Sequence, residues 1–205
     1  GVYEEARVQD YAQRLSTYVE DEKERTAALQ AAMTKLDELK AEGYAAADYV
    51  CIAPASVWYT KQFPEDRWLA LIDRLPAEYA VYLIGGPDDR ELCSRLAQQA
   101  AKEKVHNVAG QHSFLATAAL MERARMNYVN DSARLHIASA MNAPVRAVFC
   151  STVPAFGFYP VSDDSKVVEV DYDLYCRPCG LHGFKQCPEG HFKCARDIDI
   201  DKLLT

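Results

Sequence analysis

The stretch "YAVYLIGGPDDRELCSRLAQQAAKE", residues 79–103, decides the fold class. It begins with a short apolar run, 79–86, that ends in paired glycines, and it continues with a longer polar and apolar segment, 89–103. A short apolar run that ends in glycine is typical of a buried strand, whereas a longer segment of this composition favours a helix. The stretch therefore predicts one strand–turn–helix unit.

The same alternation continues on both sides of this unit. Further strands are predicted at 49–54, 105–110, 125–130, 144–149 and 166–170, and further helices at 64–75, 113–124 and 132–142. Strands that alternate with helices of this length are typical of βαβ units. We therefore predict an α/β fold for residues 49–205: a Rossmann-like, doubly wound parallel sheet of about six strands.

Residues 1–48 differ in character from the rest of the chain. They predict two helices, at 3–19 and 22–42, and Gly43 follows the second as a stop signal. Runs of β-branched residues are missing from this part. We interpret residues 1–48 as a helical linker or docking appendage to the domain at 49–205.

Composition excludes several function classes. The chain has 205 residues, a net charge of −7 and 49% hydrophobic residues. The acidic balance argues against a nucleic-acid partner, because phosphate backbones recruit basic surfaces. No apolar run approaches the ~20 residues that span a bilayer, and no signal segment opens the chain. Seven cysteines, an odd number, fit a reducing compartment. We therefore expect a cytoplasmic protein.

Ligands of open parallel sheets bind beyond the carboxyl ends of the strands, so the loops that follow the predicted strands hold the candidate site. The candidate residues in these loops are Ser56, Thr60, Lys61, Gly86, Asp88, Gly110, Asp131, Ser132, Ala133 and His136.

The loop "NDSARLH", 130–136, brings three chemically different side chains together. Ser132 is placed as a helix N-cap that accepts from free backbone N–H groups, and the first helical turn could then hold a phosphate. His136 lies one turn later on the same face, and Asp131 could accept from sugar hydroxyls. The alternative is a capped helix with a buried histidine that donates to a carbonyl.

Two other loops allow a similar pair of interpretations. Lys61 could counter a diphosphate, or it could be an exposed surface lysine; the glycines of a Walker loop are missing. Asp88 could bind ribose hydroxyls beside Gly86, or it could be a solvated acid in a plain turn.

In chain order, the segments "APASVWYTKQFP", "LIGGPDDRE", "NVAGQHS", "NDSARLHIASAMNAPV", "FCSTVPAFGFYP" and "CRPC…CPEGHFKC" resemble glycosyltransferase family 9. This family contains the ADP-heptose:lipopolysaccharide heptosyltransferases. The resemblance covers roughly residues 49–198 and the C-terminal half of the family. It implies a GT-B enzyme, whose C-terminal half binds the nucleotide sugar. The N-terminal half of such an enzyme binds the acceptor and supplies the catalytic carboxylate.

The resemblance implies inverting transfer of heptose from ADP-heptose to the lipopolysaccharide core, without a cofactor. The acceptor would lie at the inner membrane, so the enzyme would be cytoplasmic or peripheral to that membrane. Lacking the N-terminal acceptor domain, the 205-residue chain is expected to bind the donor and to transfer little.

The same resemblance assigns roles to individual residues. Ser56 and Lys61 match diphosphate-holding positions, and Asp88 matches an acid that contacts the nucleoside. Residues 131–136 match the family's Asp–Ser/Thr–Gly–x–x–His signature around the diphosphate and donor sugar. Lys61, Asp131 and His136 would stabilise the leaving diphosphate. Two residues depart from the family: Ala133 replaces the usual Gly, and Arg134 stands where Pro or Leu is frequent.

The tail "CRPCGLHGFKQCPEGHFKC", 176–194, has the spacing C-x2-C-x7-C-x6-C. Its four cysteines, Cys176, Cys179, Cys187 and Cys194, could hold a tetrahedral zinc ion, but the second pair is wider than in a common zinc ribbon. We favour packed or free thiols over zinc, and zinc over a disulfide. Two alternatives to the transferase remain open: a zinc-organised, cysteine-rich interaction module, and another nucleotide-sugar enzyme such as an epimerase.

Overall fold

The structure, a computed structural model, describes residues 48–205 and six residues of the preceding segment, Lys23, Glu24, Thr26, Ala27, Gln30 and Thr34. These six residues are helical. The remaining part of the predicted appendage, including the helix at 3–19, lies outside the described residues. In the part of the chain that the structure describes, no helix has both the length and the apolar content that a bilayer crossing requires.

Six parallel strands form one sheet in the order β3-β2-β1-β4-β5-β6. Their bounds are β1 (Tyr49–Ala53), β2 (Ala80–Leu83), β3 (Val105–Asn107), β4 (Met126–Asn130), β5 (Val145–Val148) and β6 (Ser165–Val168). The chain runs outward from β1 through β2 to β3, and it then crosses back to place β4 on the other side of β1. This order is that of a Rossmann-like sheet, so the predicted α/β class is confirmed.

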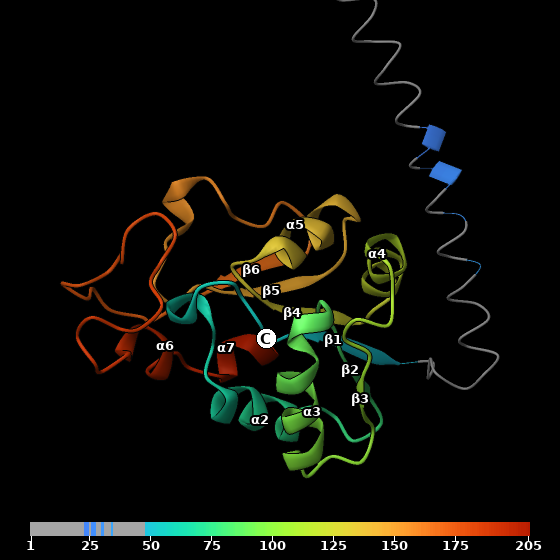
Figure 1. Cartoon of the computed structure of the whole chain (residues 1–205), viewed down its shortest axis with the longest axis horizontal. Helices are drawn as coiled ribbons and strands as arrows, with labels where there is room; N and C mark the ends of the chain where they lie inside the picture. Colours follow the sequence, from blue (N-terminus) through green and yellow to red (C-terminus); the bar gives the residue numbers. More distant parts are fainter. Residues whose placement is uncertain (1–22, 25, 28–29, 31–33, 35–47) are drawn as a thin grey trace, which may run out of the picture.

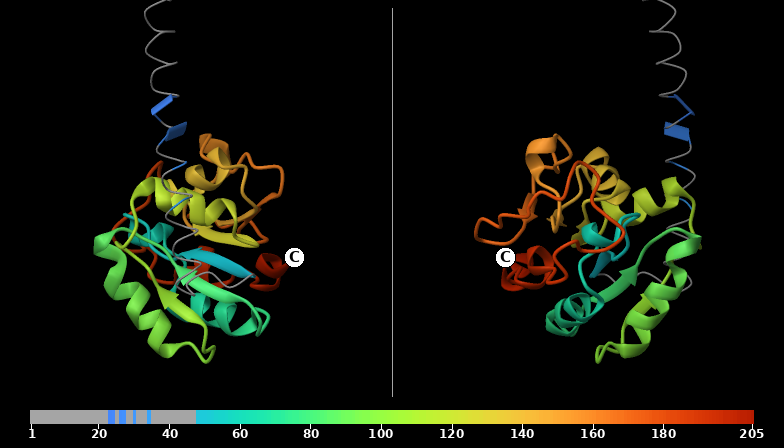
Figure 2. Two further views of the ribbon diagram at one scale, coloured as in Figure 1. Left: turned by 90° about the vertical axis from the view of Figure 1, so that its right-hand side faces the viewer. Right: turned by 60° about the vertical axis from the view of Figure 1, so that its left-hand side comes forward.

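Helices cover both faces of the sheet (Figure 1). One face carries α2 (Glu65–Arg74) and α3 (Arg90–Gln99). The short C-terminal helices α6 (Lys193–Arg196) and α7 (Asp201–Leu204) pack on the same face. The other face carries α4 (Phe114–Glu122) and α5 (Ala133–Ala140), and the turned views in Figure 2 show the same two layers. Three short 3-10 turns, η1 (Tyr59–Lys61), η2 (Pro87–Asp89) and η3 (Pro154–Phe156), follow strands β1, β2 and β5.

The central position of β1 in the sheet explains why this strand is apolar at every residue. Val50 and Ile52 pack into one core cluster, whereas Tyr49 and Cys51 pack into the other. Successive side chains point to opposite faces of a strand, and here both faces are covered. A strand buried on both sides therefore reads as an uninterrupted apolar run.

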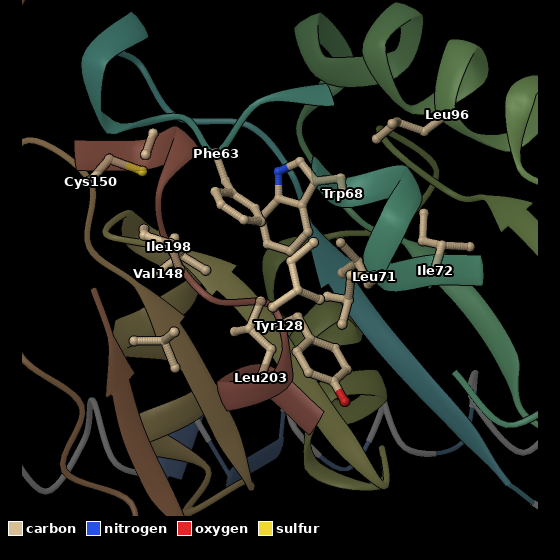
Figure 3. Close-up of a cluster of buried hydrophobic side chains, with 14 of the residues drawn as sticks. Phe63, Trp68, Leu71, Ile72, Leu96, Tyr128, Val148, Cys150, Ile198 and Leu203 are labelled. Carbon is tan, nitrogen blue, oxygen red and sulfur yellow. The ribbon is translucent and has the colours of Figure 1, made fainter. Parts of the chain in front are cut away.

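The C-terminal segment is part of the core of the α2 face. Figure 3 shows Ile198 and Leu203 beside Phe63, Trp68 and Leu71. The Phe63 and Trp68 rings meet edge to face, with centroids 5.2 Å apart, and Ile198 and Leu203 are 0% and 1% exposed. The C-terminal end of the cysteine-bearing tail is therefore anchored by α6 and α7, which pack into the core on the α2 face of the sheet.

Candidate functional site

A cavity of about 710 Å³ opens at the carboxyl ends of the strands. Its lining comes from the loops after β1, β2, β4 and β5 and from the tail: Ala55, Ser56, Val57, Trp58, Lys61, Asp88, Asp89, Asp131, Ser132, Ala133, Arg134, His136, Phe158, Leu181 and His182. The loops after β1 and β4 contribute most of these residues, and the strand order reverses between these two strands. Such a switch point is where doubly wound sheets bind ligands, and the volume suits a small molecule.

The cavity contains a largely buried ion pair. Lys61 Nζ lies 2.8 Å from Asp131 Oδ2, and the side chains are only 16% and 8% exposed. Lys61 ends the η1 turn, and Asp131 directly follows β4. The surface-lysine interpretation of Lys61 is therefore wrong, because the ammonium group points to a buried carboxylate.

Asn130 fixes the distance between the two loops that carry this pair. It is 0% exposed; its Nδ2 donates to the Pro54 carbonyl at 2.8 Å and its Oδ1 accepts from the Phe63 N–H at 3.0 Å. Both partners belong to the loop after β1. The sequence carries one signal for this role: Asn130 is a polar residue at the end of an otherwise buried strand.

Asp131 has a second partner that the sequence did not reveal. The Thr152 hydroxyl donates to Asp131 Oδ2 at 2.6 Å, and this is the oxygen that also faces Lys61. No donor from the described residues bonds to the Asp131 Oδ1. One oxygen of the carboxylate is thus fixed by protein groups, and the other is left for a ligand.

Ser132 occupies the predicted N-cap position, but the predicted cap hydrogen bond is wrong. Its side chain accepts from no backbone N–H of α5, and its Oγ is buried without a partner among the described residues. The Leu135 N–H, which the side chain would have capped, bonds instead to the Ser132 carbonyl oxygen at 3.1 Å. The hydroxyl therefore remains beside the first helical turn as an uncommitted donor, in a position that favours an anion.

His136 and Ala133 lie on the solvent side of α5. The His136 side chain is exposed and its ring meets Phe158 edge to face, with centroids 6.1 Å apart; the alternative of a buried, carbonyl-bonded histidine is wrong. Ala133 begins α5 and has no positive φ. Its Cβ therefore needs no strained backbone, although the family usually has glycine there.

The opposite wall of the cavity is built around η2. Asp89 Oδ2 accepts from the Gly86 N–H at 2.7 Å, and Arg134 Nη2 lies 4.0 Å from the same oxygen. The Arg134 guanidinium carbon also lies 5.9 Å from the centre of the Phe114 ring. Arg134 thus links the first turn of α5 to η2, while Asp88 remains exposed at the cavity wall.

Three of the predicted site residues do not line the cavity: Thr60, Gly86 and Gly110. Thr60 is 1% exposed and bonds to other loops. Gly110 has φ +68°, and a Cβ there would lie 2.8 Å from the Pro87 Cα. Thr60 and Gly110 thus pack against neighbouring loops, whereas Gly86 lies at the start of η2, where its N–H donates to the cavity-lining Asp89.

Carboxylates outnumber cationic side chains in the cavity lining. Lys61 and Arg134 stand against Asp88, Asp89 and Asp131. A general positive field is therefore absent from this wall. An anionic ligand here would depend on local donors: the Lys61 ammonium group, the Ser132 hydroxyl and the N-terminus of α5.

The tail cysteines line a separate cavity. Cys176, Cys179, Cys187 and Cys194 surround about 270 Å³, and none of them is disulfide-bonded. Burial, and then the neighbouring Cys176 thiol, raise the pKa of Cys179. Burial also raises the pKa of Cys194 to about 12. Among the described residues, no group of three or more His, Cys, Asp or Glu side chains is placed to hold a metal ion.

Comparison with curated proteins finds heptosyltransferases. Lipopolysaccharide heptosyltransferase 3 of Escherichia coli is 34% identical over 108 residues, which cover 51% of this chain and 32% of that protein. Lipopolysaccharide heptosyltransferase 1 of Pseudomonas aeruginosa is 31% identical over 139 residues, which cover 65% and 36%. The chain thus matches about a third of the length of these curated relatives.

Solved structures show the same fold at lower identity. The chain superposes on E. coli ADP-heptose LPS heptosyltransferase II with a TM-score of 0.65 at 18% identity, covering 87% of this chain and 49% of that one. A glycosyltransferase family 9 structure from Veillonella parvula gives 0.69 at 19% identity, covering 85% and 49%.

A family model decides the classification. The model described as glycosyltransferase family 9 (heptosyltransferase) matches residues 2–190. This match begins earlier than the resemblance at 49–198 and includes most of the N-terminal segment. Because it spans most of the chain and agrees with the fold and the loop residues, the chain belongs to glycosyltransferase family 9.

Proposed function

We propose that this chain is the donor-binding part of an inverting GT-B heptosyltransferase, which transfers heptose from ADP-heptose to the lipopolysaccharide core. The observation that carries the proposal is the Lys61–Asp131 pair inside the cavity at the sheet's switch point. An E. coli heptosyltransferase WaaC has been solved with ADP (TM-score 0.54) and with ADP-2-deoxy-2-fluoro heptose (TM-score 0.52). These ligands are the class that we propose for the cavity.

In the proposed transfer, ADP is the leaving group, so the donor site must stabilise the negative charge that develops on its diphosphate. Lys61 would supply a full positive charge, and the Ser132 hydroxyl and the first-turn N–H groups of α5 would supply fixed donors. Such preorganised groups act where charge develops and need little rearrangement. Asp131, with Oδ2 held and Oδ1 uncommitted, would accept from a sugar hydroxyl. His136 would donate from the exposed face of α5.

The acceptor side is proposed to lie in a second, N-terminal domain. The chain covers 49% of each of the two larger structural matches, and the family resemblance assigns the catalytic base and the lipopolysaccharide contact to the other half. In the proposed setting, the enzyme works in the cytoplasm or at the inner membrane surface, where its acceptor resides.

Calorimetric titration with ADP tests the donor site. We expect Lys61→Ala to weaken ADP binding by ~1–2 kcal/mol, as the loss of one charge-assisted contact should. Lys104→Ala is the matched control, because it removes the same charge from an exposed position outside the cavity. Equal affinities of wild type and Lys61→Ala, or equal losses in the two variants, would remove Lys61 from the site.

A donor panel and an ADP-release assay test the reaction class. We expect ADP-sugars to bind in preference to UDP- and GDP-sugars, and we expect no acceptor-dependent ADP release by the 205-residue chain, because general-base help and substrate proximity both require the acceptor domain. A clear preference for a UDP-sugar would favour the epimerase alternative. Acceptor-dependent turnover at the rate of a two-domain relative would place a base within this chain.

A further inference from the structure

The tail that carries the four cysteines also contacts both loops that build the donor site. Its segment 176–184 bonds to the loop after β5 and to the loop after β1, and it contributes Leu181 and His182 to the cavity wall. The contacts converge on two residues that the proposed chemistry does not use directly, Thr152 and Arg177.

Thr152 contacts the Lys61–Asp131 ion pair from outside the cavity. It is 1% exposed and does not line the cavity, yet its hydroxyl donates to Asp131 Oδ2 at 2.6 Å. Lys61 Nζ faces the same oxygen at 2.8 Å. The hydroxyl and the ammonium group together fix the rotation of the carboxylate. Without the hydroxyl, Lys61 would be the remaining side-chain partner of that carboxylate among the described residues.

Arg177 holds the backbone on which Thr152 sits. Its Nη2 lies 2.7 Å from the Thr152 carbonyl oxygen, 3.3 Å from the Phe149 carbonyl oxygen and 2.5 Å from Glu169 Oε2. The side chain is only 10% exposed. The neighbouring Cys179 N–H donates to the Ser151 carbonyl at 2.8 Å. The tail therefore bonds to three carbonyl groups of the short segment 149–152.

The same tail reaches the Lys61 loop at Thr60. The Thr60 N–H donates to the Phe184 carbonyl at 3.1 Å, and the Phe184 N–H donates to Thr60 Oγ1 at 2.7 Å. Ser151 Oγ donates to that hydroxyl oxygen at 3.0 Å. One segment of the tail thus fixes the neighbours of both members of the ion pair.

We propose that Thr152, held by Arg177, is a positioning residue for the donor site, which sets the Lys61–Asp131 geometry through its hydrogen bond to Asp131. Its effect on ligand binding rests on the proposed donor function. The geometric part does not, because it concerns only the environment of Lys61 in the unliganded chain. Two measurements therefore separate the two ideas.

The first measurement is the ADP affinity of Thr152→Val and Thr152→Ser. Valine keeps the shape and removes the donor, so we expect its Kd for ADP to rise about three- to tenfold, since a hydrogen bond to a charged group is involved but the contact with ligand is indirect. Serine keeps the hydroxyl and should stay within about twofold of wild type. In a Lys61→Ala background the valine change should add less than about twofold, because the two act as a unit.

The second measurement needs no ligand. Brief acetylation with acetic anhydride, followed by peptide mass spectrometry, gives the rate of Lys61 modification relative to the exposed Lys104. Thr152→Val should raise this ratio about two- to fivefold, because a loosened carboxylate holds the ammonium group less often; Thr152→Ser should not. Arg177→Lys, whose side-chain nitrogen ends one bond short of the position of Arg177 Nη2, should act like the valine variant and replaces it if that variant does not fold.

The outcomes divide cleanly. A wild-type acetylation ratio in both Thr152→Val and Arg177→Lys overturns the positioning role, whatever ADP does. A raised ratio with no ADP binding by the wild-type chain supports the positioning role and contradicts the donor function. A serine variant as impaired as the valine variant would show that packing, and not the hydroxyl, decides the effect.

Discussion

The contact between the tail and the Lys61 loop can be tested at a single glycine. Gly183 has φ +80°, and a Cβ there would lie 2.8 Å from Thr60 Oγ1 and 3.2 Å from Lys61 Cγ. Gly180, in the same tail segment, has φ +69° and nothing within 4 Å of a built Cβ. Alanine at either position is strained by the backbone, but only alanine at 183 also meets the site.

The magnitudes follow from this difference. An L-residue in the left-handed region costs ~1–2 kcal/mol, and this cost applies to both variants. Gly183→Ala must also displace Thr60 Oγ1, which accepts from the Phe184 N–H and from Ser151 Oγ. Each weakened hydrogen bond contributes ~0.5–1.5 kcal/mol. We therefore expect the free energy of unfolding to fall by about 1–2 kcal/mol for Gly180→Ala and by about 2–5 kcal/mol for Gly183→Ala.

Urea unfolding of the two variants and of wild type, followed by circular dichroism, gives these values. ADP titration of the folded variants gives the functional consequence: Gly180→Ala should bind like wild type, and Gly183→Ala should bind more weakly because Lys61 moves. Equal destabilisation of the two variants together with equal ADP affinity would refute the reasoning, because the contact with Thr60 and Lys61 would then carry no energy.

Three further predictions concern stability. Ala133→Gly should cost up to ~1 kcal/mol in a thermal melt, with ADP binding unchanged, because Ala133 is helical and glycine adds chain entropy; a stabilised variant would contradict the helical assignment. Asn130→Ala should cost about 2–4 kcal/mol in urea unfolding, because it orphans the Phe63 N–H and the Pro54 carbonyl; a loss below about 0.5 kcal/mol would contradict the bridging role. Stability should also fall above about pH 9: burial raises the pKa of Cys93 and of Cys194 from 9.0 to about 12, so the folded state favours the protonated thiols. Their contribution is complete below pH 9 and is lost as the pH rises toward 12; urea unfolding at pH 7, 8.5 and 10 checks this, and a flat profile would contradict it.

The sheet could be predicted from the sequence because its signals are local. Most strands between Tyr49 and Val168 lie in short, largely apolar runs, although β3 (VHN) is only partly buried, and each longer helix has a periodic face or a start signal. The structure confirms all of these elements; most are shorter than predicted, and β6 begins one residue earlier, at Ser165. The helices α6 and α7 were not predicted, since four residues are too few to show a period.

The site could be predicted only in part. The strand-end rule located Lys61, Asp131, Ser132 and His136 correctly in one cavity, because topology alone brings those loops together. The hydrogen bond from Thr152 to Asp131 joins residues 21 positions apart, and no local pattern encodes it. The cap prediction at Ser132 was wrong because the Leu135 N–H donates to the Ser132 backbone carbonyl and not to the Ser132 side chain. Every residue has such a carbonyl, so the sequence does not reveal this choice.

The bonds between Thr60 and Phe184 link residues 124 positions apart in the sequence. Contacts of such long range form late, because the chain must close a large loop before they contribute. During synthesis, which proceeds from the N-terminus, the Lys61 loop emerges long before the tail segment that anchors it. A polypeptide that stops short of Phe184 would lack this anchor even if its sheet assembled. The Lys61 loop would therefore take up its anchored conformation only after the tail segment through Phe184 has been synthesised.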